Sequence, residues 1–148
     1  MRRQALFAAG MAVLLVLVAS LAASAEERLS ISVPTANVRT GPGTDYEKSW
    51  MVEKYYPIIV LERKDRWIKF KDYEGDEGWI RDDLVSSTST VIVKKPRVNV
   101  RSGPGTHHKV AFGVEKGVPL KVKSAQGDWI QVSHADGDTG WILKTLVW

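Results

Sequence analysis

The sequence repeats itself at a fixed offset of 62 residues. The stretch "NVRTGPGTDYEKSW" begins at Asn37, and "NVRSGPGTHHKVAF" begins at Asn99. The matched positions continue without a gap, from 34 on 96 to 85 on 147. A register sustained over that length indicates two copies of one unit rather than two chance motifs. We therefore expect two domains, residues 31–86 and 91–148, joined by a short polar linker at 87–90.

Within each unit the apolar residues alternate with polar ones at a period of two. The alternation is clear at 58–60 and 68–70 in the first copy, and at 91–93, 120–122 and 130–132 in the second. Turn residues such as Asp136-Gly137-Asp138 separate these runs, and no helical stripe is present. About five short strands have too little surface for an open sheet with two good faces. The sequence predicts an all-β protein of two tandem small five-stranded barrels.

The N-terminal 25 residues have the pattern of a secretory signal peptide. Arg2 and Arg3 precede an apolar run at 5–18, and Ala23-Ser24-Ala25 offers small residues for signal peptidase. The alternative is an uncleaved membrane anchor, because the apolar stretch approaches the roughly 20 residues that span a bilayer. We expect cleavage after Ala25, since no positively charged stop follows. The protein is then exported, to the periplasm or the cell exterior, with no stable membrane insertion after cleavage.

Composition argues against disulfide bonds, a lipid-modified Cys and nucleic-acid binding. The chain has no Cys, so neither disulfides nor a lipid-modified Cys are available. Residues 26–148 hold 19 Lys and Arg against 17 Asp and Glu, which does not indicate nucleic-acid binding. The two copies differ in charge, however. Residues 31–86 carry a net charge of −2 and residues 91–148 a net charge of +5.

The order of the motifs resembles a known family. The second copy carries Asn-Val-Arg-x-Gly-Pro-Gly-Thr, Val-x-Lys-Gly-x-Pro, Gly-Asp-Trp-Ile-x-Val and a final Gly-Trp-Ile, and most of this recurs in the first copy. This series is similar to the bacterial Src-homology-3 (SH3b) domain. The resemblance implies a small five-stranded barrel with a binding role, often for peptidoglycan or wall peptides. Leu84 and Leu146 replace a Tyr of the eukaryotic relatives' groove, which argues against polyproline binding.

The Gly-Pro-Gly segments are predicted to turn the chain rather than to cradle a phosphate. Gly41 and Gly43 can take positive φ angles at no steric cost, and Pro42 presets its own φ. A phosphate loop needs a Gly-Lys-Ser/Thr ending and a following helix, and neither copy has them.

Arginines and tryptophans at equivalent positions are candidate ligand-binding residues. Strand alternation places Arg39 and Arg101 away from the core, either as solvated or acid-paired side chains or as forks for a peptide carboxylate. The same alternation makes Trp67 and Trp129 partly exposed. They either line a groove or pack in the ordinary way.

All four tyrosines belong to the first copy, which gives that copy a different surface. Tyr46 and Tyr56 are candidate recognition residues, because aromatic rings beside turns offer contact area at little entropic cost. The alternative is that two or more of the tyrosines pack against the second barrel.

The residues needed for catalysis or for metal binding are missing. There is no Cys nucleophile, and the three His residues lack acidic partners at metal-binding spacing. The segment "DYEGDEG" lacks the twelfth-position Glu of a calcium loop, and no pair of carboxylates has the pattern of a glycosidase. We predict no catalytic residue, no metal and no cofactor.

Two functions stay open at this point. The first is an exported adaptor whose barrels bind cell-wall peptidoglycan or its peptides in grooves between the Gly-Pro-Gly segment and the hairpin turns. The second is an interaction module for an envelope protein that uses the Tyr-rich face of the first copy.

Overall fold

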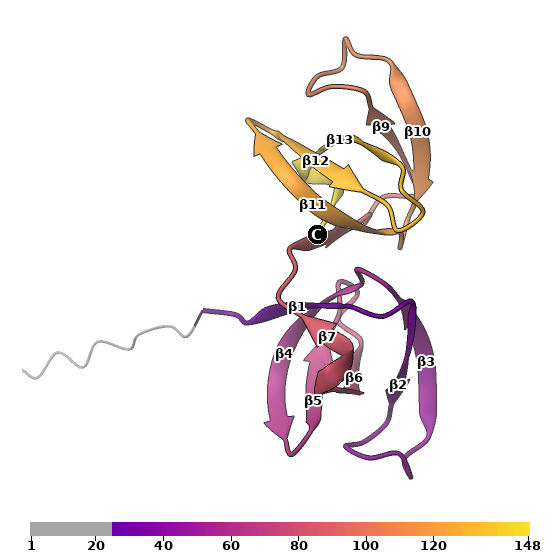
Figure 1. The fold of residues 1–148 in the computed structure, drawn as a ribbon, viewed down its shortest axis with the longest axis vertical. Coiled ribbons are helices and arrows are strands. Elements are labelled where there is room, and N and C mark those ends of the chain that lie inside the picture. The colour runs from indigo at the N-terminus through magenta and orange to yellow at the C-terminus, as the bar shows by residue number, and fades with distance from the viewer. Residues whose placement is uncertain (1–24) are drawn as a thin grey trace, which may run out of the picture.

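The computed structural model describes residues 25–148, and this part of the chain forms two β-barrels in tandem (Figure 1). The prediction of a signal peptide falls on residues that lie outside the described ones, except for Ala25. Among residues 25–148, no helix is long and apolar enough to cross a membrane. The prediction of an all-β protein made of two small tandem barrels is confirmed.

The first barrel is one sheet with the strand order β3-β2-β6-β5-β4-β1-β7. Its elements are β1 (Arg28–Ile31), β2 (Thr35–Arg39), β3 (Lys48–Glu53), β4 (Pro57–Lys64), β5 (Trp67–Lys71), β6 (Glu77–Arg81), the 3-10 helix η1 (Asp82–Leu84) and β7 (Val85–Ser86). All neighbouring strands pair antiparallel.

The second barrel repeats this arrangement with the order β10-β9-β13-β12-β11-β8. Its elements are β8 (Thr90–Ile92), β9 (Arg97–Arg101), β10 (Val110–Glu115), β11 (Pro119–Gln126), β12 (Trp129–Ser133), β13 (Thr139–Leu143) and the 3-10 helix η2 (Lys144–Leu146). A single bridge between Val93 and Val147 stands where Ile31 pairs with Val85 in the first copy.

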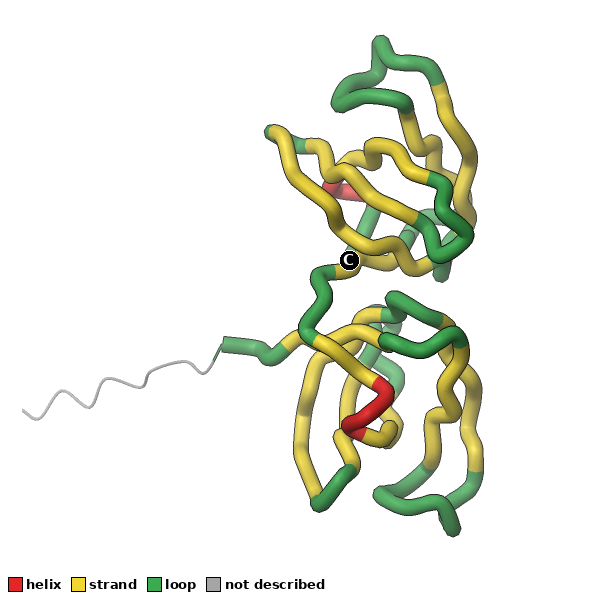
Figure 2. Tube along the Cα trace, viewed as in Figure 1, coloured by secondary structure: helices red, strands yellow, loops and turns green. Residues whose placement is uncertain are grey.

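The strand count exceeds the predicted five in both sheets. The first sheet has seven strands and the second has six, and the segments on either side of each Gly-Pro-Gly sequence pair as a hairpin. In the first barrel β2 pairs with β3 from Thr35 opposite Glu53 to Arg39 opposite Lys48. This hairpin carries the Gly-Pro-Gly loop of each barrel, residues 40–47 and 102–109, well away from the barrel body (Figure 2).

Each barrel has its own hydrophobic core, built from the alternating positions that the sequence indicates. Strands β5 and β12 both show the pattern of buried residues at the second and fourth positions. Phe70 and Ile80 are fully buried in the first core, and Val132 and Ile142 in the second. Because each cluster contains residues of one copy only, each barrel has the elements needed to fold around its own core.

The junction between the barrels is tied by one arginine of the first strand. Arg28 Nη2 donates a hydrogen bond to the Trp148 carbonyl at 2.7 Å, and its guanidinium lies 4.2 Å from the centre of the Trp148 ring. Ser30 Oγ donates to the Thr88 carbonyl at 2.8 Å. The segment expected to be a plain linker is therefore hydrogen-bonded to the first barrel, and Thr90 is already a buried residue of β8.

The two Gly-Pro-Gly loops lie at opposite ends of the molecule, and the junction lies between them (Figure 2). The C-terminal residue is at the junction, close to where β1 enters the first barrel (Figure 1). Any ligand site on one loop is thus remote from the site on the other.

Candidate functional site

The glycines of the Gly-Pro-Gly loops make room for an aromatic ring. A Cβ atom on Gly41 would overlap the Tyr46 ring, and one on Gly103 would lie 2.6 Å from the His108 imidazole. Gly41 and Gly43 do not use the positive φ angles open to them, because the glycines with positive φ in the described chain are Gly75, Gly117, Gly127 and Gly137. The loop needs glycine for close approach and not for a left-handed backbone.

Arg39 and Arg101 hold these loops in place through the same pair of hydrogen bonds. Arg39 Nη1 donates to the carbonyls of Thr44 at 3.0 Å and Tyr46 at 2.9 Å. Arg101 Nη1 donates to the carbonyls of Thr106 at 3.1 Å and His108 at 2.9 Å. Among residues 25–148 neither arginine has an acidic partner, so one edge of each guanidinium positions the loop while Nη2 makes no hydrogen bond there.

A groove runs along the first barrel between its Gly-Pro-Gly loop and the β4–β5 turn. It consists of two adjoining hollows of about 410 Å³ and 180 Å³, both of which Trp67, Thr44 and Arg81 line. We call it the loop groove. Its full lining is Asn37, Arg39, Pro42, Gly43, Thr44, Asp45, Asp65, Arg66, Trp67, Arg81 and Leu84. The structure therefore brings Arg39 and Trp67 together in one groove.

Charge in the loop groove is mixed, with a surplus of arginine. Arg81 donates to Asp83 at 2.7 Å, and Arg66 lies 3.5 Å from Asp82. Asp45 and Asp65 are the acidic lining residues. The half-buried Trp67 lies directly across the β5–β6 pair from Arg81. A flat indole flanked by guanidinium groups is suited to a peptide that carries a carboxylate.

Sequence reasoning missed Arg66 and Arg81. The signal that could have found Arg81 is the hairpin register, because Arg81 is the cross-strand partner of Trp67. Arg66 sits in the β4–β5 turn, and nothing in a single sequence says that this turn faces a loop about 20 residues earlier in the chain.

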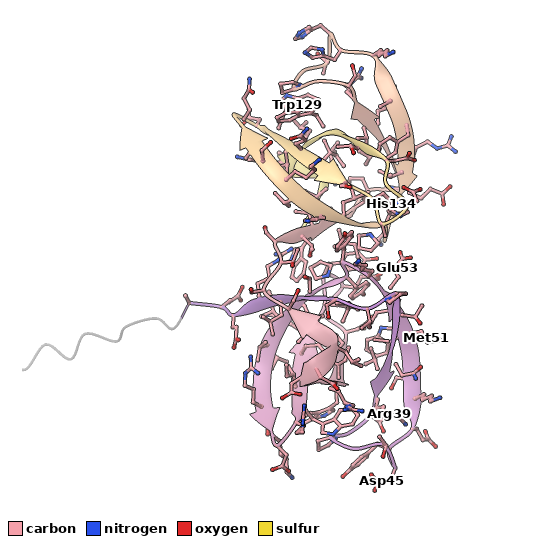
Figure 3. The ribbon with its side chains drawn as sticks, in the orientation of Figure 1. Arg39, Asp45, Met51, Glu53, Trp129 and His134 are labelled. Atoms are coloured by element: carbon pink, nitrogen blue, oxygen red, sulfur yellow. The ribbon has the colours of Figure 1, made fainter. Side chains whose placement is uncertain are left out.

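Tyr46 and Tyr56 do not share a surface. Tyr46 belongs to the Gly-Pro-Gly loop and is 45% exposed. Tyr56 is half-buried against the first core, and its hydroxyl donates to Asp72 Oδ2 at 2.7 Å. Figure 3 labels Asp45 and Glu53, the near neighbours of these two tyrosines, at opposite ends of the first barrel.

The tyrosines near the junction have unusual titration behaviour. Burial, together with the hydrogen bond to the Asp72 carboxylate, raises the pKa of Tyr56 well above its usual range. Burial and the nearby Glu74 raise the pKa of Tyr73 to about 12. The two rings meet edge to face with centroids 6.4 Å apart. Tyr73 Oη would lie 3.3 Å from a Cβ on Gly117, so this tyrosine reaches the second barrel.

The second copy presents different groups at the positions that match the loop groove. Trp129 is half-buried like Trp67 and is labelled in Figure 3. Leu143 stands in place of Arg81, and His107 and His108 stand in place of Asp45 and Tyr46. The two imidazoles lie with ring centroids 4.2 Å apart. Asp128 also stands in place of Arg66, so Arg101 and Trp129 are present without counterparts of Arg66 and Arg81.

Metal binding finds no support in the described part of the chain, since residues 25–148 contain no group of three or more His, Cys, Asp or Glu side chains placed to hold an ion.

Comparison with known proteins places both copies in one family. The bacterial SH3 domain family matches residues 32–87 and again residues 94–148. A relative from Bacillus subtilis (strain 168), provisionally named the N-acetylmuramoyl-L-alanine amidase YrvJ, is 28% identical over 135 residues. The match covers 84% of this chain and 26% of that protein, so the chain spans about a quarter of the relative's length.

Solved structures of NlpC proteins show a weaker likeness. NlpC1 from Trichomonas vaginalis is 12% identical with a TM-score of 0.38, covering 92% of this chain and 50% of that one. An NlpC/P60 family protein from Bacillus cereus ATCC 10987 is 16% identical with a TM-score of 0.40, covering 82% of this chain and 56% of that one. These scores carry no argument about function. The family match, whose two segments together cover most of the chain, identifies it: this chain belongs to the bacterial SH3 domain family and contains two copies of that domain in tandem.

Proposed function

We propose that this chain is a non-catalytic, exported binding module that holds cell-wall peptidoglycan or its peptides, with the loop groove of the first barrel as the principal site. The observation that carries the proposal is the groove itself, in which Trp67 lies among Arg39, Arg66 and Arg81. An indole face takes the body of an extended peptide, and a guanidinium takes a carboxylate.

The relative supports the wall as the source of this ligand. The name given to the Bacillus subtilis protein specifies an N-acetylmuramoyl-L-alanine bond, which joins the sugar and the peptide of peptidoglycan. The matched part is about a quarter of the relative's length, a suitable size for a module that anchors such an enzyme to the wall. We propose the binding role alone, and not the amidase activity, for this chain. In the second copy Arg101 and Trp129 are candidates for a weaker contact, because Asp128 and Leu143 replace Arg66 and Arg81.

The rival proposal, an envelope-protein adaptor with a Tyr-rich face, receives less support from the geometry. Tyr46 lies on the outer loop, whereas Tyr56 and Tyr73 pack together near the junction. Tyr46 therefore does not share a face with Tyr56 and Tyr73.

The test is retention of residues 26–148 on purified, protein-free sacculi. Trp67→Ala and Arg81→Leu should each lower retention about tenfold, the effect of losing one main contact residue. Arg81→Leu installs the residue of the second copy, so it is compatible with the fold. Met51→Ala is the control, since Met51 is 63% exposed and lies outside the groove.

The outcomes separate the proposals. Retention that depends on Trp67 and Arg81 supports the loop groove, and additional loss with Trp129→Ala assigns a second contact to the other barrel. Clean flow-through from sacculi, combined with capture of one envelope protein from an extract, would reject the wall proposal in favour of the adaptor.

A further inference from the structure

The second barrel has a pocket of about 300 Å³ that is separate from the position of the loop groove. It opens between β10, the turn that precedes β11, and the β12–β13 turn. Its lining is Phe112, Gly113, Val114, Glu115, Val118, His134, Asp136 and Asp138. None of these residues matches a lining residue of the loop groove at the 62-residue offset. We call it the acidic pocket. All of its residues come from the second barrel.

The pocket exists because smaller side chains stand where the first barrel has large ones. Phe112 and Val118 occupy the positions of Trp50 and Tyr56. In the first barrel, Trp50 packs edge-on against Phe70 with ring centroids 6.2 Å apart, and Tyr56 is tied to Asp72.

Two more differences enlarge the space. Val132 replaces Phe70 in the layer beneath, and Gly113 replaces Met51 at the edge. The same backbone arrangement therefore encloses more volume in the second copy.

The floor of this pocket is apolar and its rim is acidic. Val114 is buried, and Phe112 and Val118 are half-buried against the core of the second barrel. The rim carries the carboxylates of Glu115, Asp136 and Asp138. These are three of the four acidic residues in a copy with a net charge of +5. The local charge of the pocket is thus opposite to the charge of the barrel that forms it.

The turn that supplies two of these carboxylates is held in one geometry. Asp136 Oδ1 accepts a hydrogen bond from the Asp138 backbone N–H at 2.9 Å. His134 Nδ1 lies 2.9 Å from the same oxygen, and it accepts a hydrogen bond from the Asp136 backbone N–H at 3.4 Å. The backbone N–H and the imidazole hold the pKa of Asp136 below its usual value, so the carboxylate stays charged near neutral pH. Figure 3 labels His134 at the edge of the second barrel that faces the junction.

We propose that the acidic pocket binds a primary ammonium group carried on a short apolar stem, as in a lysine-type side chain. The methylenes of such a group pack on Phe112 and Val118, and the ammonium lies among the rim carboxylates. A carboxylate or phosphate ligand would be repelled by the same rim. This site is independent of the loop groove, because the two share no equivalent positions and lie in different barrels.

The test is an NMR titration of the two-barrel chain, residues 25–148, with Nα-acetyl-L-lysine amide. We expect saturable shifts confined to residues that line the acidic pocket, with a Kd in the millimolar range. Nα-acetyl-L-norleucine amide has the same stem without the ammonium group and should bind about fivefold more weakly, the effect of losing contacts with exposed carboxylates. The Nε-acetylated lysine probe should behave like norleucine.

Two sets of variants assign the binding to this pocket. Glu115→Gln with Asp138→Asn removes two of the three rim carboxylates and should reduce the preference for lysine over norleucine to below about twofold. The matched control is Glu53→Gln with Asp76→Asn at the equivalent positions of the first barrel, which should change nothing. Val118→Tyr installs the residue found at position 56 and should fill the pocket and block both probes.

Three results would overturn the proposal. These are equal binding of lysine and norleucine probes, shifts centred outside the pocket lining, and the lack of any saturable shift up to tens of millimolar probe. Failure of sacculus retention would reject the wall proposal and leave the amine titration unchanged, so the two proposals fail separately. The charge variants keep the test valid if Val118→Tyr does not fold.

Discussion

The two barrels have the same strand order and nearly the same loop anchors, yet they differ in what fills the space around the core. In the first barrel Trp50 packs against Phe70, and Tyr56 packs against the same core and donates a hydrogen bond to the buried Asp72 carboxylate. In the second, Phe112 and Val118 leave a pocket with an acidic rim. Conversely, the loop groove of the first barrel has an arginine where the second has Leu143.

This comparison separates what the fold requires from what each copy adds. Both copies have the arginine that donates to the loop carbonyls and the glycine that lies against an aromatic ring of the loop. These residues therefore belong to the fold. Arg66 and Arg81 of the loop groove have no arginine counterparts in the second copy, and the residues of the acidic pocket differ from their counterparts in the first. These features are therefore candidates for function. Duplication provides an internal control that a single domain lacks.

The largest expected effect concerns two equivalent glycines, Gly78 in β6 and Gly140 in β13. A Cβ on Gly140 would lie 2.8 Å from the Arg101 backbone carbonyl and 2.6 Å from Val100, whereas the atoms nearest to a Cβ on Gly78 belong to the side chains of Val38 and Trp50. Backbone moves less readily than side chains. Gly140→Ala should therefore destabilise its barrel by about 3 kcal/mol and Gly78→Ala its own by about 2 kcal/mol.

Chemical unfolding of each variant, followed by barrel-specific NMR signals, measures this difference. Equal losses, or a larger loss from Gly78→Ala, would mean that the two barrels close in the same way at this strand.

The next effect is a loss of stability at high pH that is confined to the first barrel. The pKa of Tyr73 is raised to about 12, and that of Tyr56 is raised as well, from the ordinary value of 10.0. The unfolded chain then loses these protons first. Stability is complete below about pH 10 and falls as pH rises above it. Because both side chains are partly exposed, we expect a slope of about 0.5 kcal/mol per pH unit.

Unfolding experiments between about pH 9 and 11 test this slope, with the tyrosine-free second barrel as the baseline for lysine titration. Tyr56→Phe should reduce the slope and also lower stability at neutral pH by about 1 kcal/mol, since it leaves Asp72 without one hydrogen bond. Tyr46→Phe is the control, and the same slope in both barrels would disprove the assignment.

A smaller effect should be equal in the two copies. Arg39→Lys and Arg101→Lys each remove the geometry that lets one nitrogen donate to two loop carbonyls. We expect a loss of about 1 kcal/mol in either barrel, because a lysine ammonium does not reproduce the planar guanidinium. Thermal unfolding measures it. A marked inequality would show that one loop does not depend on its arginine.

The smallest effect is a difference in salt response. Each barrel expressed alone should unfold cooperatively, because each has its own core. Retention of the basic second barrel on sacculi should weaken in about 1 M salt, because charges are then screened beyond about 3 Å. Retention of the first barrel should persist through the contact of the Trp67 indole with the ligand. Retention measured at low and high salt decides this, and equal responses would contradict the charge argument.

The sequence by itself determined the architecture. A gapless repeat with period-two alternation left little choice but two small barrels, because side-chain alternation sets which face is buried. It also identified Arg39 and Trp67 as partly exposed residues of interest. It did not reveal that Arg39 Nη1 donates hydrogen bonds to two carbonyls of its own loop.

Only the tertiary structure decided which of these residues meet. Arg66 and Arg81 reach the loop groove because closure of the barrel brings the β4–β5 turn and the end of β6 up to the Gly-Pro-Gly loop. The acidic pocket depends on the summed side-chain volume of β10, β12 and two turns, which no local pattern reports. Periodicity is a local property of the chain, whereas a cavity depends on packing between segments that are distant in sequence.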